Sequence, residues 1–216
     1  MNSSKEEKKK RAYEIFKILK AQYPDARPLL HYKNPFELLA STILAAQCTD
    51  ERVNSITPAL FERYPDPKTM AAADLQDIEH IIKPTGFFKN KAKSLKNASQ
   101  AIMKKFGGSF PENLFDLVNL PGVGRKTANV VVGNCFGQPA VIVDTHVKRV
   151  SGRLGLSSTN DPDKIEMELK DIIDEKDQTR FSLVVNFLGR YVCHAKKPLC
   201  SECKIIRLCP YPDKVS

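Results

Sequence analysis

The segment Leu120-Pro121-Gly122-Val123-Gly124 constrains the fold of this chain more than any other. Helical patterns precede it and follow it, so these five residues have to turn the chain between two helices. Two glycines permit positive φ angles and a close approach of the backbone to another molecule. The amides of the turn and of the new helix's first residues lack intrahelical partners, which suits a phosphate group. The alternative is an ordinary tight turn.

The rest of the sequence also predicts helices. Ala12, Ile15, Phe16 and Leu19 form an apolar stripe with helical spacing, which ends before Pro28, and Asn34-Pro35 opens a second helix. Val141 to Val143 is too short to require a sheet. We therefore expect an all-α fold. Further helices are expected at about 51–63, 73–82, 89–106, 112–119, 124–136, 145–153, 162–174 and 179–193.

The charge balance favours a polyanionic partner. The formal net charge is +9, and seven lysines between Lys83 and Lys105 have no carboxylate among them. Such a segment creates the positive field that DNA binding rewards through counterion release, although solubility alone would also explain it. The sequence shows no apolar run of membrane-spanning length and no secretory leader, so we expect a cytoplasmic protein.

Lys126 and Asp144 are the candidate catalytic residues. Lys126 lies in the first turn of the helix after the hairpin, where the positive end of the helix dipole favours a free amine over an ammonium. A free amine can attack a sugar carbon and form a Schiff base, whereas a charged lysine here would simply contact phosphate. Asp144 follows 18 residues later, past one helix and a return loop, so the two groups can converge. Its alternative role is an N-cap.

Four cysteines near the C-terminus predict a metal centre. Cys193, Cys200, Cys203 and Cys209 have the spacing C-x6-C-x2-C-x5-C. Four thiolates suit either tetrahedral zinc or an iron–sulfur cluster. Zinc ribbons usually pair two C-x2-C knuckles, and this sequence has only one such close pair.

These motifs together resemble the bacterial endonuclease III family over nearly the whole chain. The resemblance includes residues 35–39 (PFELL), residues 44–50 (LAAQCTD), the hairpin, the Gly, Pro and Asp pattern of 137–144, and the cysteine spacing. It implies a helix-hairpin-helix base-excision enzyme with a [4Fe–4S] cluster. It also implies two helical domains with a DNA groove between them: a six-helix barrel carrying the hairpin at 28–138, and a discontinuous cluster domain at 1–27 and 139–216, with the cluster loop at 193–209.

The resemblance also assigns roles to residues. Lys126 would be the nucleophile at C1′ of the sugar, Asp144 its electrostatic and acid–base partner, and Gln47 the residue that probes the space left by a flipped nucleotide. Without the resemblance, Gln47 would be a polar helix end. The remaining expected DNA contacts are those of the hairpin and of two lysines in the cysteine loop, which would otherwise be a solvated loop: Leu120, Gly122, Val123, Gly124, Arg125, Lys196 and Lys197.

One position departs from the family pattern. Phe87, in Gly86-Phe87-Phe88, stands where the family often has a leucine wedge beside the orphaned base. A phenyl ring can also wedge or stack in DNA, and core packing is the alternative. His146 is expected to be a structural neighbour of Asp144.

The activity that the resemblance implies is a bifunctional DNA glycosylase and AP lyase acting on oxidised pyrimidines. Its partner would be double-stranded DNA with damaged bases or abasic sites, bound by a monomer, with no membrane. One alternative is an adenine-mismatch glycosylase, which carries a glutamate where this chain has Thr42 and continues into a large C-terminal domain. The other is a non-catalytic helix-hairpin-helix protein with a zinc site.

Overall fold

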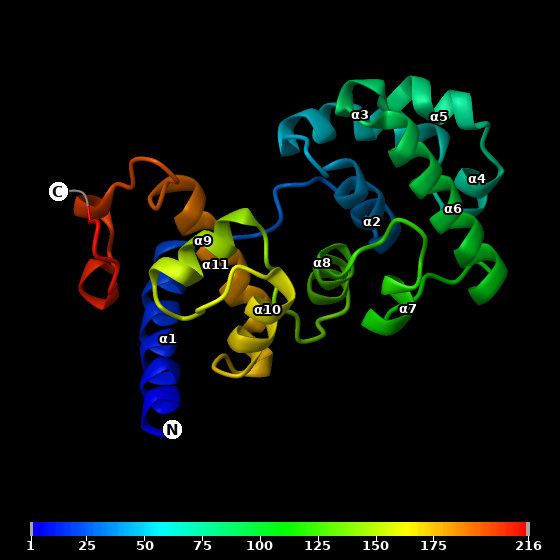
Figure 1. Ribbon diagram of the computed structural model, residues 1–216. Coiled ribbons are helices and arrows are strands. Elements are labelled where there is room, and N and C mark those ends of the chain that lie inside the picture. Colours follow the sequence, from blue (N-terminus) through cyan, green and yellow to red (C-terminus); the bar gives the residue numbers. More distant parts are fainter. Residues whose placement is uncertain (1, 215–216) are drawn as a thin grey trace. The chain divides into compact units, whose positions relative to one another are not determined.

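The computed structural model describes residues 2–214, which form α-helices and 3₁₀ turns without a β-strand (Figure 1). This confirms the expected all-α fold. The chain divides into two compact units, one formed by residues 28–138 and the other by residues 1–27 and 139–216. Within the described part of the chain, no helix has the length and apolar character needed to cross a membrane.

Unit 28–138 is a set of packed helices in which the long helix α6 contacts α2, α4 and α5, and α8 packs on α2 and α7. Its elements are α2 (Pro35–Leu44), α3 (Asp50–Arg63), α4 (Pro67–Ala72), α5 (Leu75–Ile82), the 3₁₀ turn η1 (Lys83–Thr85), α6 (Phe88–Phe106), α7 (Leu114–Val118) and α8 (Arg125–Cys135).

Helix α4 was not expected from the sequence. Asp66 caps it by accepting a hydrogen bond from the backbone of Thr69, and the Thr69 side chain accepts one back from the backbone of Asp66. Pro67 occupies the first helical position, where its missing N–H costs nothing. The signal is present in Asp66-Pro67, but a six-residue helix leaves too little apolar periodicity to be recognised. The following helix begins at Leu75 because Asp74 caps it.

The second unit packs its elements around α11 (Gln178–Tyr191), which contacts α1 (Asn2–Gln22) and α9 (Thr145–Arg153). The expected stripe on α1 is buried, and the rings of Phe16 and Phe181 lie 6.1 Å apart. The helix expected at 162–174 is shorter, because the chain turns after Lys170 and buries both isoleucines that follow. The remaining elements are α10 (Pro162–Lys170) and the 3₁₀ turns η2 (Glu175–Asp177), η3 (Cys200–Glu202) and η4 (Ile206–Leu208).

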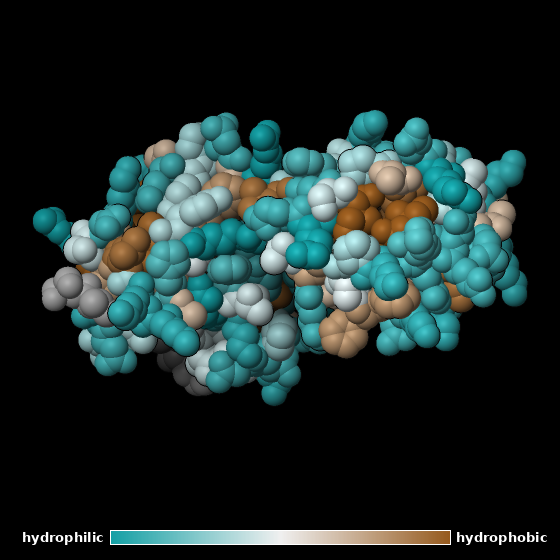
Figure 2. All heavy atoms as spheres, turned by 90° about the horizontal axis from the view of Figure 1, so that it is seen from above, coloured by the Kyte–Doolittle hydropathy of each residue, from teal (hydrophilic) through white to brown (hydrophobic). Residues whose placement is uncertain are grey.

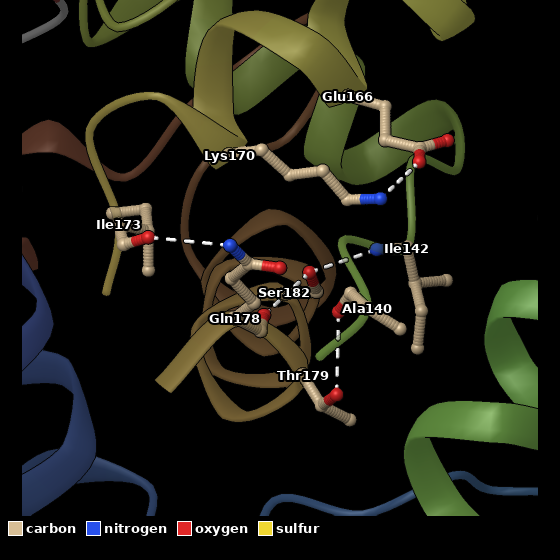
Figure 3. A network of polar contacts seen from close by, with 8 residues as sticks. All are labelled: Ala140, Ile142, Glu166, Lys170, Ile173, Gln178, Thr179 and Ser182. Carbon is tan, nitrogen blue, oxygen red and sulfur yellow. Dashed lines mark hydrogen bonds and ion pairs between the residues drawn. The ribbon is translucent and has the colours of Figure 1, made fainter. Parts of the chain in front are cut away.

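Residues 140–143 are extended but do not form a strand, and side chains of α11 bond two of their backbone groups (Figure 3). The amide of Ile142 donates to Ser182 Oγ over 2.9 Å, and Ser182 in turn donates to the carbonyl of Gln178. Thr179 donates to the carbonyl of Ala140 over 3.2 Å. The extended segment is thus fixed on α11, and it leads directly into Asp144.

Hydrophilic side chains cover much of the face shown in Figure 2, with apolar patches between them. Among the described residues, large apolar side chains are mostly buried in each unit, and a few are exposed. Phe87 is among them, with 65% of its surface exposed. The core-packing alternative for Phe87 is therefore excluded.

Candidate functional site

The hairpin between α7 and α8 is built around a glycine that no other residue can replace. Gly122 has a φ of 77°, and a Cβ atom there would lie 2.4 Å from Ser94 Oγ on α6. The side chains of Leu120 and Val123 are buried, and the amide of Val123 donates to the carbonyl of Leu120 over 3.1 Å. The turn is therefore anchored by its apolar side chains. The amide of Leu120 also donates within the turn, to the carbonyl of Leu117 over 3.1 Å, so both expected contact residues use their side chains and amides inside the unit.

Lys126 is exposed at the second position of α8. The N-cap residue of this helix is Gly124, which has no side chain to cap the amides of the first turn. Farther along α8, Ala128 and the residues after it through Val132 are buried, which holds the helix firmly in the unit. Lys126 thus projects from a firmly packed helix. It lies beside backbone amides that can donate hydrogen bonds to an anion.

A pocket beside the hairpin brings together two residues that the resemblance singled out. Gln47 and Phe87 line it with Gly122 and Thr127 from the hairpin side. Its volume of about 270 Å³ is below that of typical small-molecule sites, as expected of a concave surface that receives part of a larger ligand. The remaining lining residues are Thr42, Ile43, Ala46, Asn90, Lys91 and Ser94.

Gln47 and Phe87 share an unusual backbone conformation. Their φ angles are 52° and 48°, and they are the only residues other than glycine with positive φ in the described part of the chain. A non-glycine residue in this region costs about 1–2 kcal/mol, and such strain concentrates at ligand-binding positions. Both residues are exposed despite that cost. The pattern of hydrophobic residues in the sequence did not predict this left-handed conformation.

Asp144 is held through both oxygens of its carboxylate. Oδ1 accepts the amide of Val147 over 2.7 Å, which makes Asp144 the N-cap of α9. Oδ2 accepts Nδ2 of Asn186 on α11 over 2.5 Å, and Asn186 Oδ1 accepts Nε of Arg190 over 3.0 Å. The expected N-cap role is confirmed, and it fixes the direction of the carboxylate. Sequence reasoning missed Asn186, because a single polar residue on a helix carries no distinguishing pattern.

His146 is tied to the structure around Asp144. Its Nδ1 lies 3.2 Å from Nη2 of Arg149, whose guanidinium also donates to the carbonyls of Gly189 and Cys193. Burial lowers the pKa of His146, although the neighbouring Asp144 carboxylate opposes this. A neutral imidazole in this network is a packing residue, in line with its expected structural role.

The four C-terminal cysteines line one cavity, together with apolar residues of α9 and α11. Burial raises the pKa of the Cys203 thiol, and the other three thiols are close enough to raise it further. All four are free and half-buried. Among residues 2–214, no three His, Cys, Asp or Glu side chains are arranged to hold a metal ion. The donor set of four thiols around one cavity nevertheless fits the chemistry of either a zinc or an iron–sulfur centre.

Two arginines of α9 attach the cysteine loop to the unit. Arg149 donates to the carbonyl of Cys193 through Nε and Nη2, over 3.1 and 2.9 Å. Arg153 lies 3.2 Å from the Cys193 sulfur and donates to the carbonyl of His194 over 2.7 Å. Lys196 and Lys197 are exposed, as expected for a loop that presents its charges outward. One helix thus carries Asp144 at its first turn and holds the cysteine loop at its last.

The comparisons with known proteins agree on the class of this fold and site. Residues 40–175 match the model of the HhH-GPD superfamily of base excision DNA repair proteins. Endonuclease III of Synechocystis sp. is 53% identical over 94% of this chain and 93% of its own length. Endonuclease III of Bacillus subtilis is 43% identical over 87% of this chain and 86% of its own length.

A solved structure gives the same result in three dimensions. A trapped endonuclease III–DNA covalent intermediate superimposes with a TM-score of 0.89 at 40% identity, over 94% of this chain and 96% of that one. The chain therefore belongs to the endonuclease III family of helix-hairpin-helix base excision repair enzymes. It is a DNA glycosylase, and DNA is its partner.

Proposed function

We propose that this protein is a bifunctional glycosylase and AP lyase that removes oxidised pyrimidines from duplex DNA as a monomer in the bacterial cytoplasm. The observation that carries the proposal is the exposed amine of Lys126 at the start of α8, next to the glycine hairpin. The 40% identical relative is described as a trapped covalent intermediate with DNA, and such an intermediate requires a nucleophile on the protein.

The proposed reaction begins with extrusion of the damaged nucleotide, which costs least when the lesion stacks poorly. The nitrogen lone pair of Lys126 attacks C1′, and the base departs with the bonding electrons. The Asp144 carboxylate stabilises the positive charge that develops on the sugar and assists proton transfer. Ring opening gives a Schiff base with Lys126, which acidifies C2′. Loss of that proton expels the 3′ phosphate by β-elimination and cuts the strand.

Gly122, Gly124 and Arg125 are proposed to contact the DNA backbone, since they form the turn at the N-terminus of α8, where the helix dipole favours a phosphate. Gln47 and Phe87 are proposed to occupy the space that the extruded nucleotide leaves. Lys196 and Lys197 add phosphate contacts from the cysteine loop. These contacts are independent of base sequence, which suits an enzyme that searches for damage.

We also propose that Cys193, Cys200, Cys203 and Cys209 hold a [4Fe–4S] cluster. When bound, the cluster would hold the cysteine loop together through its four ligands. The residues of the reaction described above act without it. Cys203→Ser is expected to remove the broad visible absorption of the protein and lower its iron content from about four atoms per chain. Cys48→Ser is the matched control, because Cys48 is a half-buried free thiol of the other unit. A colourless wild-type protein with one zinc per chain contradicts this assignment.

A panel of damaged duplexes tests the proposed activity. Strand cleavage is expected with thymine glycol, dihydrouracil and an abasic site, and no adenine release is expected from an A·G mismatch. The substrate class is the one that the resemblance to endonuclease III implies, and strand cleavage follows from an amine nucleophile. The absence of adenine release follows from Thr42 at the position of the mismatch enzymes' glutamate. Base release without strand cleavage would show that the protein is a monofunctional glycosylase and would contradict the proposed lyase activity. Adenine release alone would replace the proposal with the mismatch activity.

A further inference from the structure

Gln47 and Phe87, the two pocket residues other than glycine with positive φ, each follow a short chain segment. The last carbonyl of each segment accepts a hydrogen bond from the same buried lysine. Leu44 is the last residue of α2, three residues before Gln47, and Thr85 is the last residue of η1, two residues before Phe87. Nζ of Lys91 donates to the carbonyl of Leu44 and to that of Thr85, over 2.8 Å in each case. One side chain therefore joins the two segments just before both left-handed residues.

Lys91 is almost completely buried, with 5% of its surface exposed. It lies in the first turns of α6, and the amide of Lys91 also donates to the carbonyl of Phe87 over 3.1 Å. Burial lowers the pKa of Lys91. An apolar side chain of similar length would be cheaper to bury, so what the lysine specifically supplies is two directed hydrogen bonds.

We infer that Lys91 is a positioning residue, which holds Gln47 and Phe87 in the geometry required to fill the gap left by an extruded nucleotide. This rests on the proposed DNA role of that pair. Loss of either bond frees a segment end to relax toward ordinary backbone angles, because a left-handed non-glycine residue persists only where the surrounding structure holds it. A displacement of about 1 Å at such a position is enough to lower a rate strongly.

The chain offers a test of positioning that needs no DNA. It contains no tryptophan, so Phe87→Trp places a single fluorescent reporter on the segment. Adding Lys91→Met is expected to lower the fluorescence anisotropy of this reporter markedly, because the segment becomes more mobile. Quenching by acrylamide is expected to rise only modestly, because a side chain at this position is already 65% exposed. Lys91→Arg keeps the donors and is expected to restore most of the wild-type values. Unchanged anisotropy and quenching in the methionine variant overturn the inference.

Lys96→Met is the matched control. Lys96 is also a partly buried lysine of α6, and its Nζ donates to the carbonyl of Ala73 over 2.6 Å at the end of α4. It does not line the pocket. The control therefore removes a comparable lysine–carbonyl bond, and it is expected to leave the tryptophan signal unchanged. Equal changes in both variants mean a general loss of stability and contradict a specific role of Lys91.

The activity readout compares two substrates of the full-length protein. Lys91→Met is expected to lower kcat/KM for excision from a damaged duplex by about tenfold or more, with little change in borohydride trapping on a single-stranded abasic oligonucleotide, which has no gap to fill. Adding Lys91→Met to a variant that already carries Gln47→Ala and Phe87→Ala is expected to lower kcat/KM little further. Equal losses on both substrates, or fully additive losses, refute the positioning role. If the wild-type protein is inactive on both substrates, the proposed function is rejected. The fluorescence result still tests the positioning role in that case.

Discussion

Lys126→Ala is expected to abolish borohydride-dependent cross-linking of this protein to DNA that carries an abasic site. Borohydride reduces a Schiff base to a stable amine, so trapping reports directly on an amine that attacks C1′. Strand cleavage at an abasic site should fall by about a thousandfold or more, because removal of a nucleophile eliminates the covalent route. The measurement is the fraction of shifted DNA on a denaturing gel.

Lys126→Arg separates the two roles that a lysine at this position can have. Arginine keeps the positive charge for a phosphate contact, but its guanidinium does not deprotonate and cannot form the Schiff base. Trapping is therefore expected to disappear in Lys126→Arg while affinity for an abasic duplex is retained. Lys104→Ala removes an exposed lysine of α6 in the same unit and serves as the control. Wild-type trapping in either Lys126 variant would refute the nucleophile assignment.

Much of the fold follows from local signals in the sequence. The hairpin was predicted because prolines, glycines and helix periodicity act over a few residues, and the helices on both sides lie close to the expected bounds. The short helix after Asp66 was missed because its capping box is local but its apolar pattern is too brief. Helix α10 ends early because tertiary packing of two isoleucines competes with helix continuation.

The supporting residues of the site had no comparable signal. Gly122 is required because Ser94 of α6 approaches it, and that contact joins positions 28 residues apart in sequence. Lys91 lay in a run of lysines that predicted a solvated, positively charged segment, yet its side chain is buried against two carbonyls. Such contacts depend on which helices meet, which a single sequence does not specify.

The position of Asp144 depends on both ends of α9. At the first turn, the carboxylate caps the helix and accepts the amide of Asn186. At the last turn, Arg153 is bonded to the loop that carries Cys193. The helix therefore connects the proposed acid–base group to the proposed cluster loop. Disturbing the loop is therefore expected to act on catalysis through this helix.

Asp144→Asn is expected to lower single-turnover excision of an oxidised pyrimidine by about a hundredfold or more while the thermal midpoint changes little. Asparagine is as good an N-cap as aspartate, so the bond to Val147 remains, whereas the negative charge and the oxygen that accepts the amide of Asn186 are lost. The carboxylate acts on charge that develops in the transition state, so its loss appears mainly in the rate of the chemical step. Quench-flow measurement of base release, with the enzyme in excess, reports that rate.

Asp144→Ala and Asn186→Leu separate the capping role of the Asp144 carboxylate from the role of its charge. The alanine variant loses the charge and the cap, and its stability should fall by about 1 kcal/mol in addition to the loss of rate. Asn186→Leu leaves the charge and the cap but removes the bond to Oδ2, so its effect on excision should be intermediate between wild type and Asp144→Asn. If Asp144→Asn instead excised the base at the wild-type rate and only Asp144→Ala was impaired, the carboxylate would serve as a helix cap alone, and the proton transfers would require another group.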